Sequence, residues 1–181
     1  DPLAVLLNAF SKIERDGGGA SLQILVAGGA SKYHASYREI IKRVEKGEKA
    51  SVAIRKSTLG GEILEGLKDF VLTSKKDEEK EDKAKSNNSD KIELFNNKID
   101  APILATNIRL VVSAKTTARA ERILSELESA FHQFQSTKGN QFLPKRISGM
   151  SRLRELKSFS FREYTPKFDI PLSLKELATI I

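Results

Sequence analysis

The chain has 181 residues, of which 39% are hydrophobic and 30% are charged, which is the composition of a globular domain with a sizeable core. It contains no cysteine, which excludes disulfides and thiolate metal sites, and no apolar run approaches the roughly 20 residues of a membrane-spanning helix. The formal net charge is +7, which is compatible with phosphate-bearing or acidic partners.

The first expected element is a helix that begins at Asp1-Pro2, where an N-cap residue precedes proline at the first helical position. Apolar residues recur at helical spacing as far as Ile13, and glycines at 17–19 end this helix. The short β-branched and apolar run that follows predicts a strand at about Ala20–Ala27.

Ser36 and Glu39 have the spacing of a capping box, which predicts that the next helix covers Tyr37–Lys46. A second helical pattern covers Gly61–Thr73. Residues 75–91 are almost entirely polar and mix basic with acidic side chains. Because such a segment cannot bury enough apolar surface to fold as a core element, we expect a flexible charged insertion there.

Further along the chain, Ile92–Phe95 is expected to be a short edge strand and Ile103–Ala114 a second principal strand. A wide apolar stripe predicts a long helix over Thr117–Phe134. Lys138–Gly149 is expected to be irregular, and Ser151–Ser158 a short helix.

Phe159–Tyr164 alternates like a half-buried strand. Ser173 and Glu176 then form a second capping box, which opens a final helix. We read residues 1–172 as one α/β domain, and 173–181 as the start of a helix that leads toward a further domain.

One strand–helix unit is used twice in this order of elements. Ser21–Val26 and Asn107–Val112 are similar short apolar runs, and each is followed by a polar turn and an amphipathic helix. The repeat predicts a mixed α/β (α+β) fold, specifically a ferredoxin-like open sandwich with its helices mostly on one face, extra helices and the charged insertion.

No catalytic, metal or cofactor site is expected from these residues. Gly28–Lys32 lies between a strand and a helix but lacks the GxxxxGK[ST] spacing of a phosphate-binding loop, so a plain turn is the better interpretation. His34 and His132 are the only histidines and lack further ligands at matched spacing. We therefore expect this chain not to be an enzyme.

The excess positive charge lies near the C-terminal end of the chain. We take seven basic residues as candidate nucleic-acid-binding residues: Lys138, Lys145, Arg146, Arg152, Arg154, Lys157 and Arg162. Such a region attracts phosphate backbones or acidic protein surfaces, while the alternative is an ordinary solvated basic face. Phe159, Phe161 and Tyr164 lie in the same stretch and are candidates for base stacking, or else core and edge residues.

Three stretches together carry a family resemblance. They are residues 1–26 (DPLAVLLNAFSKIERDGGGASLQILV), residues 107–134 (NIRLVVSAKTTARAERILSELESAFHQF) and residues 168–181 (FDIPLSLKELATII). Leu172, Ser173, Glu176, Leu177 and Ala178 match an L-S-x-x-E-L-A pattern. The set resembles the region that precedes the motor in conjugative, type IV secretion-type DNA-transfer ATPases of the FtsK–HerA class, and it covers about half of the chain.

The resemblance implies a non-catalytic accessory or assembly domain beside a hexameric motor. The expected partners are other subunits of the motor or secretion complex, with DNA as a second partner for the basic region and membrane contact only through parts outside this chain. The implied location is cytoplasmic, at the inner face of the membrane. A free-standing basic α/β module that binds nucleic acid is the alternative function.

Overall fold

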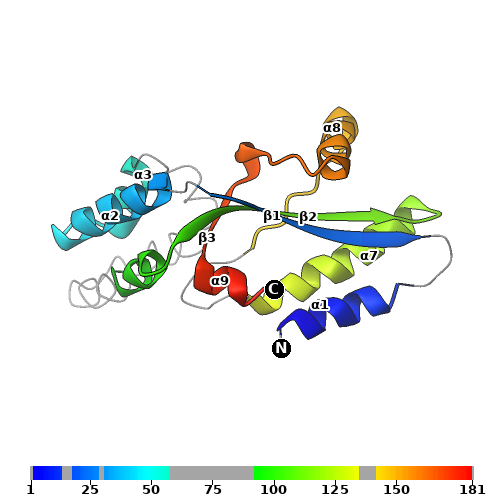
Figure 1. Cartoon of the computed structure of the whole chain (residues 1–181), viewed down its shortest axis with the longest axis horizontal. Coiled ribbons are helices and arrows are strands. Elements are labelled where there is room, and N and C mark those ends of the chain that lie inside the picture. The colour runs from blue at the N-terminus through cyan, green and yellow to red at the C-terminus, as the bar shows by residue number, and fades with distance from the viewer. Residues whose placement is uncertain (1, 14–17, 29–30, 58–91, 135–141, 181) are drawn as a thin grey trace, which may run out of the picture.

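A three-stranded antiparallel sheet organises the computed structural model, which describes residues 2–13, 18–28, 31–57, 92–134 and 142–180 (Figure 1). The strands are β1 (Gly19–Ala27), β2 (Ile103–Ser113) and β3 (Ile170–Ser173), in the order β1-β2-β3. β2 pairs with β1 along the whole length of β1, from Gly19 opposite Ser113 to Ala27 opposite Ala105. The long central strand β2 is therefore the axis on which the other elements are placed.

One face of the sheet is apolar and is covered by helices. These are α1 (Pro2–Ser11), α7 (Thr117–Ala130) with the 3-10 turn η1 (Phe131–Phe134), and α9 (Leu174–Ala178), which lie below the sheet in Figure 1. Leu6 and Phe131 pack there against Leu22 of β1 and Ile108 of β2. The side chains alternate along β2, so the even-numbered positions face this core.

A second core lies at one end of the sheet, around the first residues of β2. It is built by α2 (Ser31–Glu45), α3 (Ala50–Lys56) and the helical residues 92–99. The buried side chains include Tyr33, Tyr37, Ile40, Ile54, Phe95 and Ile103. Because Ile103 and Ala105 point to the opposite face from Ile108, α2 packs here and not beside α7, although both helices follow a repeated strand.

Three local expectations were wrong. α2 begins at Ser31, and Ser36 is 2% exposed in its interior, so Ser36 and Glu39 do not cap a helix. Residues 92–99 are helical, with Phe95 buried against Tyr37, so Ile92–Phe95 is not an edge strand. Phe159–Tyr164 is not a strand either, because α8 (Gly149–Ser160) includes its first residues and a turn follows.

Several other expectations were confirmed. The first helix, both principal strands and α7 lie where the sequence predicts them, and α8 extends the helix expected at Ser151–Ser158. α3 and β3 were not predicted. The expected helix Gly61–Thr73 and the charged segment 75–91 lie outside the described residues. The fold is a mixed α+β fold, as expected.

The capping box at Ser173 was predicted correctly, and it is joined by a buried lysine. The Ser173 hydroxyl accepts from the Glu176 N–H, while Glu176 Oε2 accepts from the Ser173 N–H at 2.7 Å. The same oxygen lies 2.5 Å from Lys98 Nζ, whose side chain is 6% exposed. Burial lowers the pKa of Lys98, and the charge of Glu176 acts against that shift. Glu176 therefore stabilises both the start of α9 and a buried charge.

We expect Glu176→Ala to lower the free energy of unfolding by about 3 kcal/mol, since it removes a cap and leaves the Lys98 charge buried without its partner. Lys98→Met is the matched comparison, because it removes the buried charge and keeps a long side chain. It is expected to cost less than about 1 kcal/mol. Urea unfolding measures both values, and equal losses in the two variants would contradict this account.

The buried hydroxyl of Tyr37 makes the stability of the fold depend on pH in the alkaline range. Its pKa lies above the ordinary value of 10.0, because burial disfavours the phenolate and the negative charge of Glu176 adds to the effect. Above pH 10.0 the unfolded chain loses this proton while the folded protein keeps it, so stability is present below that pH and falls as the pH rises. Urea unfolding at neutral pH and above pH 10.0 should show a smaller alkaline loss for Tyr37→Phe than for the native protein.

Candidate interaction surface around α8

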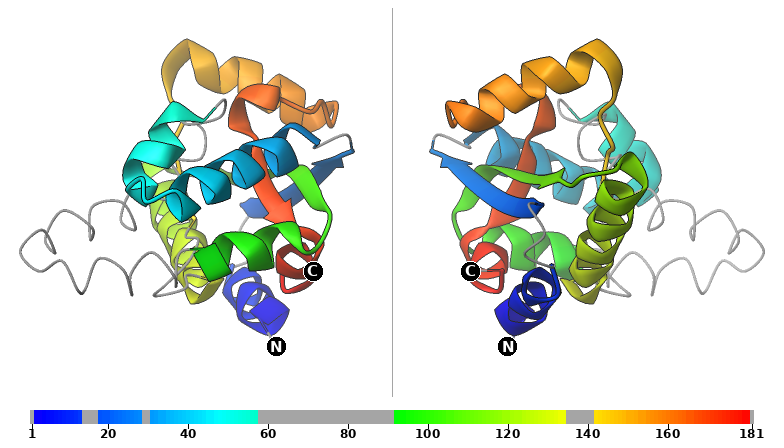
Figure 2. Two further views of the ribbon diagram at one scale, coloured as in Figure 1. Left: turned by 90° about the vertical axis from the view of Figure 1, so that its left-hand side faces the viewer. Right: turned by 90° about the vertical axis from the view of Figure 1, so that its right-hand side faces the viewer.

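α8 lies on the face of the sheet opposite α1 and α7, and it projects from the rest of the molecule (Figures 1 and 2). None of its twelve residues is buried. A helix in a folded domain normally buries one apolar face, which supplies most of its stability. α8 is therefore positioned by contacts at one end and not by a hydrophobic face.

Arg109 of β2 is the centre of these contacts. Its guanidinium donates to Thr165 Oγ1 at 2.7 Å, to Asn107 Oδ1 and Gln23 Oε1 at 3.2 Å each, and to the Ser158 carbonyl at 3.4 Å. Gln23, the cross-strand neighbour of Arg109, donates to the Phe159 carbonyl at 3.1 Å. These bonds place a positive charge at the C-terminal end of α8, where the helix dipole favours it.

Asn107 fixes the chain that follows α8. It is 1% exposed, donates to the Phe168 carbonyl at 3.0 Å and accepts from the Thr165 N–H at 2.8 Å. Because both of these backbone groups are satisfied by one buried amide, the segment 165–168 has a defined position over the sheet. Asp169 extends the network, since it accepts from the hydroxyls of Tyr33 and Tyr164 and pairs with Lys32.

α8 ends in a Schellman motif with an unusual residue in it. The Glu163 N–H donates to the Ser158 carbonyl at 2.8 Å, and the Arg162 N–H donates to the Phe159 carbonyl at 3.1 Å. The residue in the left-handed conformation is Arg162, with φ +54°, whereas glycine normally occupies this position. The side chain of Arg162 is exposed.

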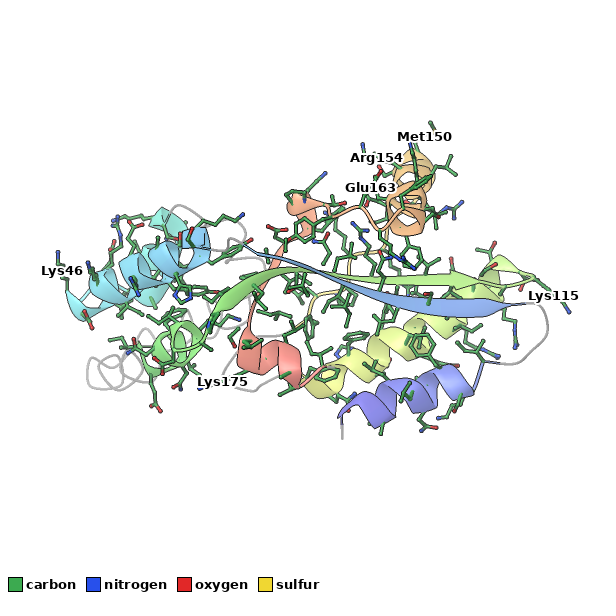
Figure 3. All side chains as sticks on the ribbon, in the orientation of Figure 1. Lys46, Lys115, Met150, Arg154, Glu163 and Lys175 are labelled. Atoms are coloured by element: carbon green, nitrogen blue, oxygen red, sulfur yellow. The ribbon has the colours of Figure 1, made fainter. Side chains whose placement is uncertain are left out.

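Three of the four large apolar side chains of α8 are exposed, namely Met150, Leu153 and Leu156, and Phe159 is half-buried. Met150 is 84% exposed and Leu153 is 63% exposed, and Phe161 directly after the helix is 69% exposed. Figure 3 shows Met150 and Arg154 at the top of α8, pointing away from the sheet. Glu155, Ser158 and Phe159 are only half-buried and lie on the opposite side of the helix. This arrangement reverses the usual pattern of a surface helix.

The structure brings four of the seven predicted basic residues together on or beside α8. Arg152, Arg154, Lys157 and Arg162 are all exposed there. Lys145 lies before the helix, with its Nζ 6.0 Å from the centre of the Phe168 ring. Arg146 pairs with Glu128 of α7 at 2.8 Å and donates to Ser125 Oγ, so its contacts hold residues 142–148 against α7. Lys138 lies outside the described residues.

The three candidate stacking residues separate in the structure. Phe161 is exposed, Phe159 is half-buried, and Tyr164 is half-buried with its hydroxyl bonded to Asp169. Arg109 and Asn107, the residues that position the surface, were not singled out from the sequence. Polar residues at alternate positions of an otherwise apolar strand were the signal that could have identified them.

The part of the chain that the structure describes contains no group of three or more residues able to hold a metal ion. Among the same residues no helix is long and apolar enough to cross a bilayer. Comparisons with known protein families, with curated proteins and with solved structures found no match. The surface around α8 is therefore interpreted from its own geometry.

We expect Arg109→Met to loosen α8 while the two cores stay folded, because the substitution removes the guanidinium that joins the sheet to Ser158 and Thr165. Hydrogen exchange should become faster in residues 149–165 and stay slow in α2 and α7, with a loss of about 1–2 kcal/mol in stability. Arg122→Met is the control, since Arg122 is 65% exposed on α7. Its substitution should change neither the hydrogen-exchange rates of residues 149–165 nor the stability. Uniformly faster exchange across the fold would contradict this role for Arg109.

Proposed function

We propose that the chain is a non-catalytic assembly domain of a DNA-transfer ATPase, which contacts other subunits of the motor or its secretion channel. The observation that carries the proposal is the exposed apolar side of α8. Met150 and Leu153 are exposed on the helix, and Phe161 is exposed directly after it. Exposed apolar side chains gathered on one element are typical of an interaction surface. The proposed location is the cytoplasm, at the inner face of the membrane.

The resemblance to the region before the motor of such ATPases supports the same proposal. In the last of the three matched stretches, residues 168–181, Ser173 and Glu176 form the capping box of α9, and Glu176 also pairs with Lys98. The matched residues are thus part of the framework, and the contact surface would lie elsewhere, on α8.

The coding sequence downstream of Ile181 tests the proposal directly. The expected result is continuation into a motor domain that carries the GxxxxGK[ST] motif. A stop codon shortly after Ile181 would exclude it.

Nucleic-acid binding is the second candidate, favoured by the exposed basic residues Arg152, Arg154 and Lys157 on one helix. Fluorescence anisotropy with duplex DNA should then show an affinity that falls steeply with salt, because phosphate contacts release counterions. Reversing these three charges to Glu should weaken binding about tenfold or more at low salt.

The control for this experiment reverses Arg38, Lys42 and Lys46, which are exposed on or after α2 and give the same change in net charge. It should have a much smaller effect. Absence of binding at low salt, or equal losses in the two triple variants, would contradict a DNA-binding role for α8.

The ferredoxin-like arrangement also belongs among these proposals. Two strand–helix units, β1 with α2 and β2 with α7, support it. The antiparallel pairing of β1 with β2 counts against it, because a ferredoxin-like fold has the leading strands of its two βαβ units parallel. That fold also requires a fourth strand, and the described residues contain three. An experimental structure that includes residues 58–91 tests it.

A further inference from the structure

We propose that the outward side of α8 binds the surface of an anionic lipid bilayer. Met150, Leu153 and Phe161 would enter the headgroup region, and the basic side chains beside them would contact lipid phosphates. This inference assigns the exposed residues of the proposed subunit contact to a lipid partner instead. It also gives this chain a membrane contact of its own, which the family resemblance did not imply.

Helical geometry places Met150 and Leu153 on one face of α8, because they are three residues apart, and Lys157 continues this stripe. Phe161 is exposed directly after the helix ends. Nine large hydrophobic residues are exposed among the described residues, and five of them lie within residues 143–161. The apolar exposure of the protein is therefore concentrated at α8 and the segment before it.

The charges around this stripe are mainly basic. Arg152 and Arg154 flank the stripe on its two sides, and Lys157 lies within it. Glu155 pairs with Arg154 at 3.7 Å and its side chain is only 16% exposed, and Glu163 accepts a hydrogen bond from Ser158. Arg152, Lys157 and Arg162 are exposed beyond that pair, so the basic charge exceeds the acidic charge here. Basic side chains next to an anionic membrane contribute about 1 kcal/mol each, and long ones extend from an apolar face toward the phosphates.

The shape and chemistry of the surface favour a bilayer over the other anionic partners. Phosphate contacts with nucleic acid need only the cations, and they give no reason to expose Met150 and Leu153. A helix that docks on a protein needs a matching groove in that partner. A bilayer surface accepts a projecting helix of this composition without one, and α8 lies at the periphery in every view (Figures 1 and 2).

Arg162 adds an independent observation. A left-handed conformation costs a non-glycine residue on the order of 1 kcal/mol, so arginine is a poor choice for this position on grounds of folding. Backbone strain of this kind is often found at functional sites. Arg162 is exposed and follows Phe161 directly in the chain, so it adds a positive charge next to that exposed ring.

Vesicle flotation tests the proposal with the whole chain. The native protein should float with vesicles that mix phosphatidylcholine and phosphatidylglycerol, and it should not float with phosphatidylcholine alone. Met150→Ser combined with Leu153→Ser should weaken partitioning about tenfold or more, because the apolar contact is lost. The matched control is Val5→Ser with Leu7→Ser on α1, whose side chains are 45% and 58% exposed. The control should float like the native protein.

Arg162→Gly separates binding from folding. Glycine suits the left-handed position, so the variant should unfold at the same or a higher temperature, yet its partitioning should fall about fivefold through the loss of one charge. The proposal is overturned if the native protein does not float with anionic vesicles. It is also overturned if the α8 and α1 double variants lose partitioning equally, or if the α8 double variant floats unchanged. Binding to duplex DNA without flotation would identify nucleic acid as the partner instead.

Discussion

The hydrogen bonds of Asn107 and Arg109 are the constraint around which the upper half of the molecule is arranged. Both side chains rise from the middle of the central strand, on the face opposite the apolar core of α1 and α7. A buried amide and a half-buried guanidinium cannot stay without partners in such a place. The chain between Ser158 and Phe168 supplies those partners with backbone carbonyls, a backbone N–H and the Thr165 hydroxyl. The position of α8 follows from the satisfaction of these groups.

The sequence predicted the elements whose signals are local and strong. The strands around Leu22 and Ile108 and the long stripe of α7 were correct because apolar periodicity decides them. The capping box predicted at Ser173 was correct, because both reciprocal hydrogen bonds between Ser173 and Glu176 form. The same spacing at Ser36 lies inside a helix that starts five residues earlier, so no capping box forms there. The prediction of an edge strand at Ile92–Phe95 was wrong because a short apolar run does not distinguish a strand from a helix. The packing of Phe95 against Tyr37 favours the helix that the structure shows there.

The candidate site was predictable in its charges and not in its arrangement. Clustering in the sequence identified Arg152, Arg154 and Lys157 because they lie within six consecutive residues, and the structure keeps them on one element. The same clustering grouped Arg146 with them, although its pairing with Glu128 depends on a helix 18 residues earlier in the chain. No sequence pattern indicated that Arg109 would contact Thr165, since that contact joins positions 56 residues apart. Long-range polar contacts of this kind are fixed by the fold and not by spacing.

The reversed polarity of α8 follows from what lies beneath it. The sheet offers the polar side chains of Gln23 and Arg109 at this place, and they donate to the carbonyls of Phe159 and Ser158. This end of the helix therefore meets the sheet through backbone groups, while Met150 and Leu153 face outward. A helix with no buried residue contributes little hydrophobic stabilisation to the domain. Met150 and Leu153 can therefore be replaced with little effect on folding, and any loss of binding in such variants can be assigned to the surface itself.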